Sequence, residues 1–193
     1  MISEQSAETR FDPSELVLLD RIEGQHTLLE SFAVEDISAQ YVAWLNDPEV
    51  VRYSNQRFIT HTAHSCTLYV RNFKGSVSKL FKIIRKSDAT TIGTITAHIN
   101  QFHQTADLGI LIGERSSWGK GLGGDAWFAL LNALLSLRQI RKVTAGTMDC
   151  NQSMIRVIQK SGMKLEAVRS KQELLDGKPQ DILYFAKFNE KSV

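Results

Sequence analysis

The sequence contains few cysteines, and this scarcity narrows the kinds of protein it encodes. Its two cysteines, Cys66 and Cys150, lie far apart, and no CxxC motif occurs. A disulfide framework or a zinc site normally uses more cysteines at closer spacing. We therefore expect neither a disulfide-stabilised domain nor a metal site.

Net charge and long apolar runs are also scarce. The net charge is +2, and the basic stretches KIIRK and RQIRK are short and interrupted by apolar residues. A protein that follows a nucleic-acid backbone usually gathers many more basic residues on one face. No apolar run approaches the roughly 18 residues of a membrane-spanning helix, and no signal peptide is recognisable. We expect no nucleic-acid or membrane partner and a cytoplasmic location.

Length and composition favour one folded unit. With 193 residues, of which 42% are hydrophobic, the chain is long enough for one sizeable core. Residues 1–16 are polar and aperiodic, which predicts a flexible tail ahead of a single domain over residues 17–193. No internal repeat or low-complexity linker divides this domain.

Hydrophobic periodicity predicts a mixture of strands and helices in the first half of the chain. Two short strands should flank a turn at Glu23–Gly24, and the first helix should end at Asn46, because Asp47-Pro48 follows. The other expected elements are a first helix over 34–46, a second helix over 61–73, strands over 79–86 and 90–99, and a continuously buried strand over 106–113.

The second half predicts further elements of both kinds. A glycine-rich segment opens a long apolar helix, and residues 141–148 form a strand. Asn151 should cap a short helix that stops at Gly162. The chain then forms a β-hairpin around Asp176–Gly177. The predicted fold class is α/β, more closely a mixed α+β arrangement with one mixed sheet and helices on its faces.

Four glycines crowd the start of the long helix. Gly119, Gly121, Gly123 and Gly124 lie within six residues, directly before the apolar run. Glycine costs about 0.5–1 kcal/mol relative to alanine in regular structure, so a tight turn alone is a weak explanation. Glycines leave the first helical N–H groups uncovered at the positive end of the helix dipole. We expect a phosphate or pyrophosphate there, with Lys120 adding positive charge.

Two familiar phosphate motifs fit this segment poorly. Walker A fails, because Glu114 and Gly121 occupy two of its required positions. The dinucleotide fingerprint GxGxxG matches residues 119–124, and Asp149 ends the next strand. However, residues 114–118 separate the glycines from the preceding strand, and the chain after Asp149 is too short for a doubly wound sheet. A dinucleotide-dependent oxidoreductase therefore stays as a competing hypothesis.

The segment Trp118-Gly-Lys-Gly-Leu-Gly123 resembles the pyrophosphate loop of the GNAT superfamily of acetyl-CoA-dependent N-acetyltransferases. That loop has the form Arg/Gln-x-x-Gly-x-Gly/Ala. Trp118 stands where Arg or Gln is usual, as in the branch of ribosomal-protein alanine and serine acetyltransferases. Residues 151–167 are similar to the family's Asn-led short helix and the Lys-x-Gly-Phe after it, with Met163 for Phe. Residues 41–62 resemble bacterial GNAT proteins associated with amino-sugar and sugar-nucleotide acetylation.

The resemblance implies a GNAT-like central sheet, mixed but mostly antiparallel, flanked by helices and ending in a C-terminal β-hairpin. It also implies acetyl-CoA as cosubstrate, no metal, and direct attack of an amine on the thioester in a ternary complex. The implied coenzyme contacts are Ile110, Leu111 and Ile112 of the apolar strand, Trp118, Gly119, Lys120, Gly121, Leu122, Gly123 and Gly124 of the loop, and Asn151. The implied acceptor contacts are Tyr53, Arg57, Phe58 and His61.

The catalytic acid and base are less defined. The position of the family's usual Tyr holds Ile158, which cannot donate a proton, and the other possible donors are Tyr184, Ser153 and Cys150. Asp107 and His103 precede the coenzyme strand and are the candidate catalytic bases, with His98 a weaker one.

The sequence leaves the acceptor open. An amino sugar or a sugar nucleotide is favoured over a protein N-terminus, because a protein acceptor would need an open groove. A non-catalytic acyl-CoA-binding module is a further alternative, since Ile158 departs from the family pattern. The oligomeric state is also open, with a homodimer as one option.

Overall fold

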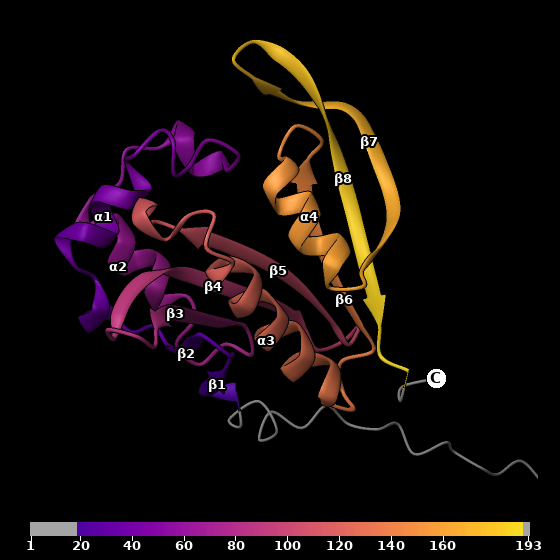
Figure 1. Cartoon of the computed structure of the whole chain (residues 1–193), viewed down its shortest axis with the longest axis horizontal. Helices are drawn as coiled ribbons and strands as arrows, with labels where there is room; N and C mark the ends of the chain where they lie inside the picture. The colour runs from indigo at the N-terminus through magenta and orange to yellow at the C-terminus, as the bar shows by residue number, and fades with distance from the viewer. Residues whose placement is uncertain (1–18, 191–193) are drawn as a thin grey trace, which may run out of the picture.

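One eight-stranded sheet runs through the protein (Figure 1). The structure is a computed structural model and describes residues 19–190, so the tail expected over 1–16 lies outside the described residues. The strands follow the spatial order β1-β2-β3-β4-β5-β6-β8-β7. Neighbouring strands are antiparallel except β5 and β6, which are parallel. The predicted mixed, mostly antiparallel sheet is therefore confirmed.

The strands are β1 (Arg21–Glu23), β2 (Thr27–Ser31), β3 (Lys79–Arg85), β4 (Thr90–Asn100), β5 (Thr105–Ile112), β6 (Lys142–Met148), β7 (Lys164–Leu175) and β8 (Lys178–Phe188). The α-helices are α1 (Ala39–Leu45), α2 (Ala63–Arg71), α3 (Leu122–Ser136) and α4 (Gln152–Lys160). Short 3₁₀ turns occur at Val34–Asp36, Asn55–Phe58 and Arg115–Ser117.

Local sequence signals explain where the helices begin and end. Side-chain oxygens of Ser38, Thr62 and Asn151 accept backbone N–H groups at the starts of α1, α2 and α4. Such caps satisfy donors that have no partner inside the helix. After α4 the chain turns at Gly162, whose φ of 79° is left-handed. The predictions of an Asn151 cap and a Gly162 stop are both confirmed.

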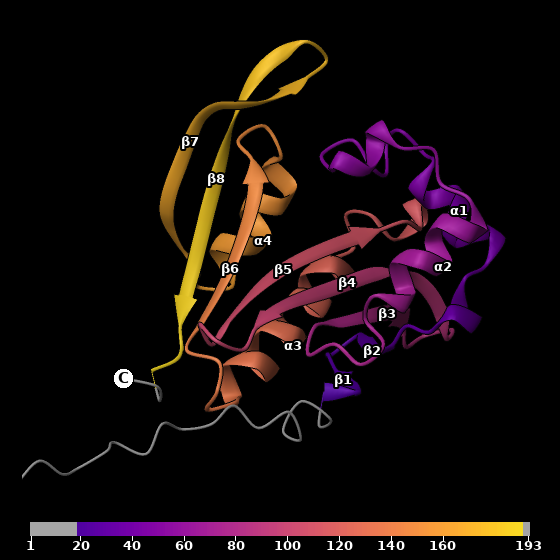
Figure 2. The same cartoon turned by 180° about the vertical axis from the view of Figure 1, so that it is seen from behind.

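The C-terminal hairpin of β7 and β8 also forms where the sequence predicts it. Asp176 and Gly177 connect the two strands with φ angles of 51° and 74°. Two left-handed residues in succession match the right-handed twist of a hairpin. Beyond its pairing with β6, this hairpin extends as a long arm away from the sheet (Figures 1 and 2).

Helices cover both faces of the sheet. Helices α3 and α4 lie on one face, and α1 and α2 lie on the other (Figures 1 and 2). The main core lies under α3, where Trp127, Leu130 and Leu131 are fully buried. A second cluster joins Tyr41 and Trp44 of α1 to α2 and β3.

One prediction about β5 is wrong. The apolar run over 106–113 suggested a continuously buried strand, yet Asp107 and Gly109 are exposed and Ile110–Ile112 are only half-buried. Residues 107 and 109 lie on the face of the strand opposite the main core, which is left exposed there, and β6 pairs with β5 only as far as Asp107. Beyond that residue, one edge of β5 has no neighbouring strand.

The Asp125 carboxylate ties the first turn of α3 to the turn between β1 and β2. It accepts the N–H groups of Gln25, His26 and Thr27 at 2.8–3.0 Å and the Thr27 hydroxyl at 2.6 Å. Partial burial alone would raise the pKa of Asp125, but these four donors outweigh it and hold the pKa below its ordinary value. The start of α3 is therefore anchored to the far edge of the sheet.

We predict that Asp125→Asn lowers the free energy of unfolding by about 2 kcal/mol at pH 7, because it weakens several charge-assisted hydrogen bonds. A depressed pKa stabilises the fold above the unfolded-state value of about 4, and this stability is lost as pH falls through the native value. Denaturant unfolding at several pH values should show the two proteins converging in acid. The control Asp20→Asn removes a surface ion pair with Lys79 and should cost under about 1 kcal/mol. Equal losses in both variants at pH 7 would contradict the role of Asp125.

Candidate active site

The sheet opens between β5 and β6. Their parallel pairing covers three rungs, which end at Asp107 opposite Thr144. Past this point β5 continues along β4 and β6 continues along β8, so the two strands diverge (Figures 1 and 2). The divergence leaves a gap with strand backbone along its sides, and we take it as the centre of the candidate site.

The backbone of Ile110 and Ile112 faces this gap. The Gly113 N–H donates to the Ile92 carbonyl of β4, and backbone groups alternate between the two edges of a strand. Leu111 therefore faces β4 through its backbone, and its side chain packs on the α1–α2 cluster. The Trp118 indole N–H donates to the Ile112 carbonyl at 2.8 Å. The backbone N–H and carbonyl of Ile110 therefore lie on the edge of β5 that has no neighbouring strand.

The glycine-rich loop, residues 118–124, lies between the end of β5 and α3. Gly119 and Gly121 have φ angles of 72° and 80°, and a Cβ on either would meet no atom within 4 Å. Gly121 is the N-cap of α3 and no side chain caps the helix. The first α3 hydrogen bond runs from the Asp125 N–H to the Gly121 carbonyl. The N–H groups of residues 122–124 precede that bond and can bind an anion.

Of the other two glycines, Gly123 is required by packing and Gly124 is not. A Cβ on Gly123 would lie 3.2 Å from Cγ1 of Ile112, which is closer than ordinary contact. A Cβ on Gly124 would lie 3.9 Å from Val157 of α4. The left-handed backbone at Gly119 and Gly121 favours glycine, and Gly123 lets α3 approach β5 closely. This open, uncapped helix start fits a diphosphate group.

Asp107 sits where the gap closes, on the α1–α2 side of the sheet. The Thr144 hydroxyl donates to its Oδ1 at 2.5 Å, and His98 lies opposite on β4. Although Asp107 keeps part of its surface open to solvent, the surrounding protein atoms desolvate its carboxylate and raise its pKa above the ordinary value, and the hydrogen bond from Thr144 and the charge of His98 oppose this only in part. The carboxylate can therefore accept a proton more readily than a solvated one.

His103 lies elsewhere. It is exposed in the turn between β4 and β5, where its carbonyl accepts Nε of Arg141 at 2.9 Å. The glycine-rich loop follows the opposite end of β5, roughly 25 Å along the strand at about 3.3 Å per residue. Of the two candidate bases only Asp107 lies at the gap, and the structure brings His98 rather than His103 beside it.

Tyr184 provides a hydroxyl near the gap. The sequence offers no reason to prefer it over Ser153 or Cys150 as the proton donor. It lies opposite Gly146 on the neighbouring strand, and a Cβ on Gly146 would lie 3.2 Å from its ring. The guanidinium of Arg169 lies 5.0 Å from the ring centre. Ile158, in contrast, is fully buried in the core. The sequence signal that could have favoured Tyr184 is Gly146, because the absence of a side chain there lets the ring of Tyr184 pack over β6.

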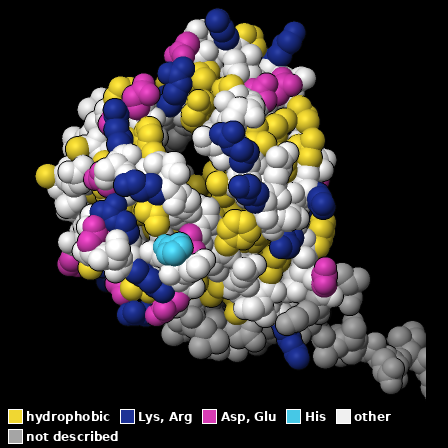
Figure 3. Space-filling model, viewed as in Figure 1, with side chains coloured by type: hydrophobic (Ala, Val, Ile, Leu, Met, Phe, Trp, Pro, Cys, Tyr) yellow, Lys and Arg dark blue, Asp and Glu magenta, His cyan; other side chains and the backbone are white. Residues whose placement is uncertain are grey.

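The segment between α1 and α2 meets the tip of the C-terminal hairpin. Arg57 donates to the Leu174 carbonyl at 3.0 Å, and Arg52 pairs with Asp176 at 2.7 Å. A cavity of about 450 Å³ lies at this junction, lined partly by Phe58. Figure 3 shows the molecule hollowed between the segment that joins α1 to α2 and the hairpin, with Lys and Arg side chains at the rim. These long-range contacts carry no local sequence signal.

The remaining predicted contacts are spread around the site. Arg57 and Phe58 line the cavity, and the guanidinium lies 4.2 Å from the phenyl ring centre. Tyr53 is exposed. His61 is held by Asn46 through its backbone, and its Nε2 is buried with no hydrogen-bond partner. Asn151 uses its side-chain oxygen to cap α4.

Two kinds of feature are absent from residues 19–190. No group of three or more His, Cys, Asp or Glu side chains in this range could hold a metal ion. No helix in the same range is long and apolar enough to cross a membrane.

A glycine-rich, uncapped helix start beside a split sheet forms a site that can bind a phosphate-bearing ligand. The family model described as "Acetyltransferase (GNAT) domain" matches residues 26–164. The chain belongs to this family and is a GNAT acetyltransferase. The resemblance of the glycine loop and the α4 segment to this superfamily is thereby confirmed.

Solved structures share the fold. A GNAT-family acetyltransferase from Bacillus anthracis is 21% identical, with a TM-score of 0.75 over 88% of this chain and 99% of that one. RimL, a ribosomal L7/L12 alpha-N-protein acetyltransferase in complex with coenzyme A, is 16% identical, with a TM-score of 0.77 over 89% and 99%. The microcin C7 self-immunity acetyltransferase MccE, with acetyl-CoA and AMP, is 16% identical, with a TM-score of 0.72 over 85% and 93%. The sequence has no significant match among the curated proteins.

We predict that Gly121→Val weakens coenzyme A binding by at least about tenfold, which corresponds to roughly 1.4 kcal/mol. A β-branched residue resists the left-handed backbone that exposes the helical N–H groups. Isothermal titration calorimetry measures the loss. Gly75→Val is a matched control, because Gly75 has a similar φ of 74° and open space around a Cβ. Gly75→Val should carry the same strain and bind normally, and normal binding by Gly121→Val would contradict the assignment of the loop.

Proposed function

We propose that this protein transfers the acetyl group of acetyl-CoA to the primary amine of a small acceptor, by direct attack in a ternary complex. The proposal rests on one observation. The uncapped start of α3 lies at the open end of the gap in the sheet, and the carboxylate of Asp107 lies at its closed end. Acetyl-CoA supplies an activated thioester. The protein supplies the anchoring, the orientation and the proton transfers.

Each part of the gap has a role in this proposal. The N–H groups at the start of α3, with Lys120, hold the diphosphate. The open edge of β5 at Ile110 pairs with the pantetheine arm and offers an N–H to the thioester oxygen. Asp107 accepts the proton of the acceptor ammonium, which its raised pKa favours. Tyr184 donates a proton to the departing thiolate.

Tyr184 weakens the case for a non-catalytic coenzyme-binding module. That alternative rested on Ile158, which replaces the family's usual proton donor. A phenol on β8, leaning over Gly146, offers a donor from another element. The presence of Ile158 at the family's usual Tyr position therefore does not leave the site without a proton donor.

The closed junction at the cavity favours a small acceptor over a protein N-terminus. Arg57 and Arg52 link the segment between α1 and α2 to the hairpin tip. These contacts lie across the path that an extended peptide would need. The cavity walls combine charged groups (Glu49, Arg52 and Asp176) with the apolar surface of Phe58. A sugar carries hydroxyl groups and apolar ring faces, so an amino sugar or a sugar nucleotide matches this lining.

An acceptor panel tests the proposed reaction. The protein is incubated with acetyl-CoA and one amine at a time: an amino sugar, a nucleotide-linked amino sugar, a polyamine, and a peptide with a free N-terminal serine. Release of the coenzyme A thiol is followed with a thiol reagent. We expect the fastest release with one of the sugar amines. Fastest release with the peptide would overturn the proposed acceptor class, and coenzyme binding without release from any amine would favour the non-catalytic module.

We predict that Asp107→Asn lowers kcat/KM at pH 7 by about 100-fold, the usual scale for a lost general base. The basic form acts, so wild-type activity should rise with pH through the raised pKa of Asp107, and the variant should lack this acid limb. Thr144→Val removes the hydrogen bond that opposes the effect of burial. Its acid limb should therefore move to higher pH. Unchanged pH profiles in both variants would exclude Asp107 as the base.

A further inference from the structure

Gly109 lies inside β5, although the backbone there does not require a glycine. Its φ angle is not positive, so residues with a side chain could adopt the same conformation. Glycine in the interior of a strand lowers stability and supplies no side chain for packing. It often marks a place that a ligand approaches closely. Gly109 is therefore a candidate for a role in substrate binding.

The space that a side chain at position 109 would fill is open, and we call it the Gly109 space. Gly109 is exposed, and its side-chain position points to the same face of the sheet as Asp107 and Leu111. Among the described residues, and apart from its neighbours in the chain, a Cβ on Gly109 would have one atom within 4 Å. That atom is the hydroxyl oxygen of Thr96, at 2.9 Å. No packed neighbour therefore explains the glycine.

The surroundings of the Gly109 space come from three directions. Asp107 precedes Gly109 by two residues and lies on the last rung that β5 shares with β6. Leu111 follows by two residues and packs on the cluster of α1, α2 and β3. Across the gap, the ring of Tyr184 packs over Gly146. The Gly109 space therefore lies between the proposed base and the covering helices, on the opposite side of the gap from the proposed proton donor.

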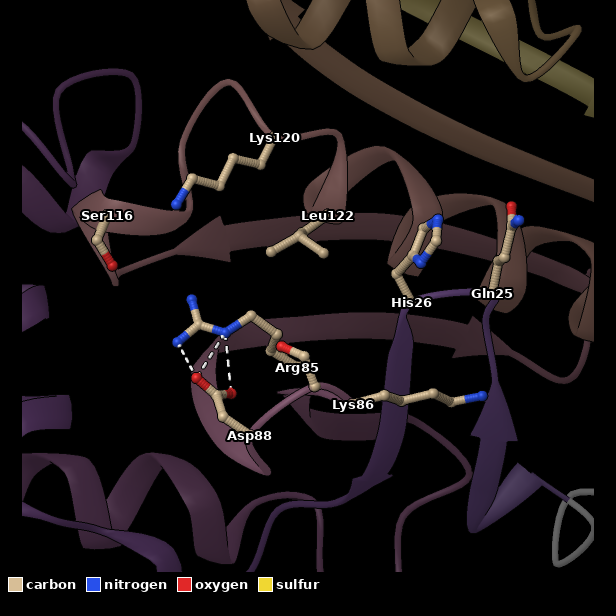
Figure 4. A pocket seen from close by; sticks show the side chains of 9 residues that line it. Gln25, His26, Arg85, Lys86, Asp88, Ser116, Lys120 and Leu122 are labelled. Carbon is tan, nitrogen blue, oxygen red and sulfur yellow. Dashed lines mark hydrogen bonds and ion pairs between the residues drawn. The ribbon is translucent and has the colours of Figure 1, made fainter.

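The largest hollow of the described residues is poorly suited to an amine. It measures about 820 Å³ and lies between the β1–β2 turn, the β3–β4 turn and the glycine-rich loop. Its lining includes Arg85, Lys86 and Lys120, and the one carboxylate among the lining residues, Asp88, is already bound to Arg85 at 2.6 Å (Figure 4). An ammonium group would be repelled there. The face that carries Asp107 is therefore the better route for a cationic acceptor.

The position of the amine in the proposed reaction makes Gly109 important. A nitrogen that gives its proton to Asp107 lies at hydrogen-bond distance from the carboxylate, so the carbon that carries it lies within roughly 4 Å. The Cα atoms of Asp107 and Gly109 are separated by about 6.6 Å along the strand, at 3.3 Å per residue. The substituents of that carbon must therefore fit beside position 109.

We propose that Gly109 is a specificity-determining residue whose missing side chain admits primary amines carried by a branched carbon, such as a ring carbon of an amino sugar. The proposal rests on the proposed function, because it requires the amine to bind at Asp107. With a side chain at position 109, the same site would favour amines carried by a methylene group.

Two isomeric amino sugars test the proposal. In glucosamine the amine is attached to a ring carbon, and in its isomer 6-amino-6-deoxyglucose it is attached to a methylene group. The two acceptors have equal size and charge. Release of the coenzyme A thiol gives kcat/KM for each isomer, and the readout is the ratio of glucosamine to its isomer. A general loss of stability lowers both values and leaves the ratio unchanged.

Gly109→Ala should lower this ratio by about tenfold, the scale of one added carbon in a tight site, and Gly109→Val should lower it further. Both variants should bind coenzyme A as wild type does. Thr96→Ala removes the one atom that a new Cβ would crowd, and this control should leave the ratio unchanged. The double variant Thr96→Ala with Gly109→Ala relieves that crowding and should keep the lowered ratio.

An unchanged ratio in both Gly109 variants would overturn the inference and leave the proposed function standing. Recovery of the wild-type ratio in the double variant would also overturn it, because displacement of Thr96 would then explain the effect. Weaker coenzyme A binding by Gly109→Ala in calorimetry would assign the space to the coenzyme, with the same consequence.

The acceptor panel decides the remaining outcomes. If the polyamine, whose primary amines are all on methylene groups, reacts fastest with wild type, the inference is overturned. If the peptide reacts fastest, the same ratio is measured with N-terminal serine and N-terminal glycine, which differ in branching at the amine-bearing carbon. Thiol release from no amine at all would overturn the proposed function and this inference with it.

Discussion

The early end of the parallel pairing between β5 and β6 determines most of what this protein can do. Each strand has a second neighbour along its whole length, β4 for β5 and β8 for β6, so the sheet can open between them without losing either strand. The opening exposes strand backbone that would otherwise be paired. It also places Asp107 on the last paired rung, at the point where the two strands part. A fully paired sheet would have no such edge.

The long helix α3 makes the opening useful. Its interior face is packed into the core, while its uncapped start points at the mouth of the gap. The four hydrogen bonds to Asp125 fix that start against the β1–β2 turn. A rigid helix end is a better anion site than a mobile one, because less order is lost on binding. The same anchoring holds the β1–β2 turn beside the start of α3.

The sequence predicts the structure correctly where a few adjacent residues decide it. The cap at Asn151, the stop at Gly162 and the hairpin turn at Asp176–Gly177 follow from local backbone chemistry, and each appears where predicted. The sequence pattern also located the glycine-rich loop. The prediction of a fully buried β5 was wrong, because an apolar run does not reveal which faces of a strand its neighbours cover. The sequence pattern also missed the cross-strand neighbours, such as His98 beside Asp107.

The sequence by itself determined the family, the order of the elements and the place of the glycine-rich loop before the long helix, because these depend on short motifs and on hydrophobic periodicity. Only the tertiary structure decided which distant side chains meet. Arg57 reaches the hairpin at Leu174, and Tyr184 leans over Gly146, through contacts between elements far apart in the chain. Such meetings depend on strand register and helix packing, which sum many weak interactions over the whole core. No local pattern encodes them.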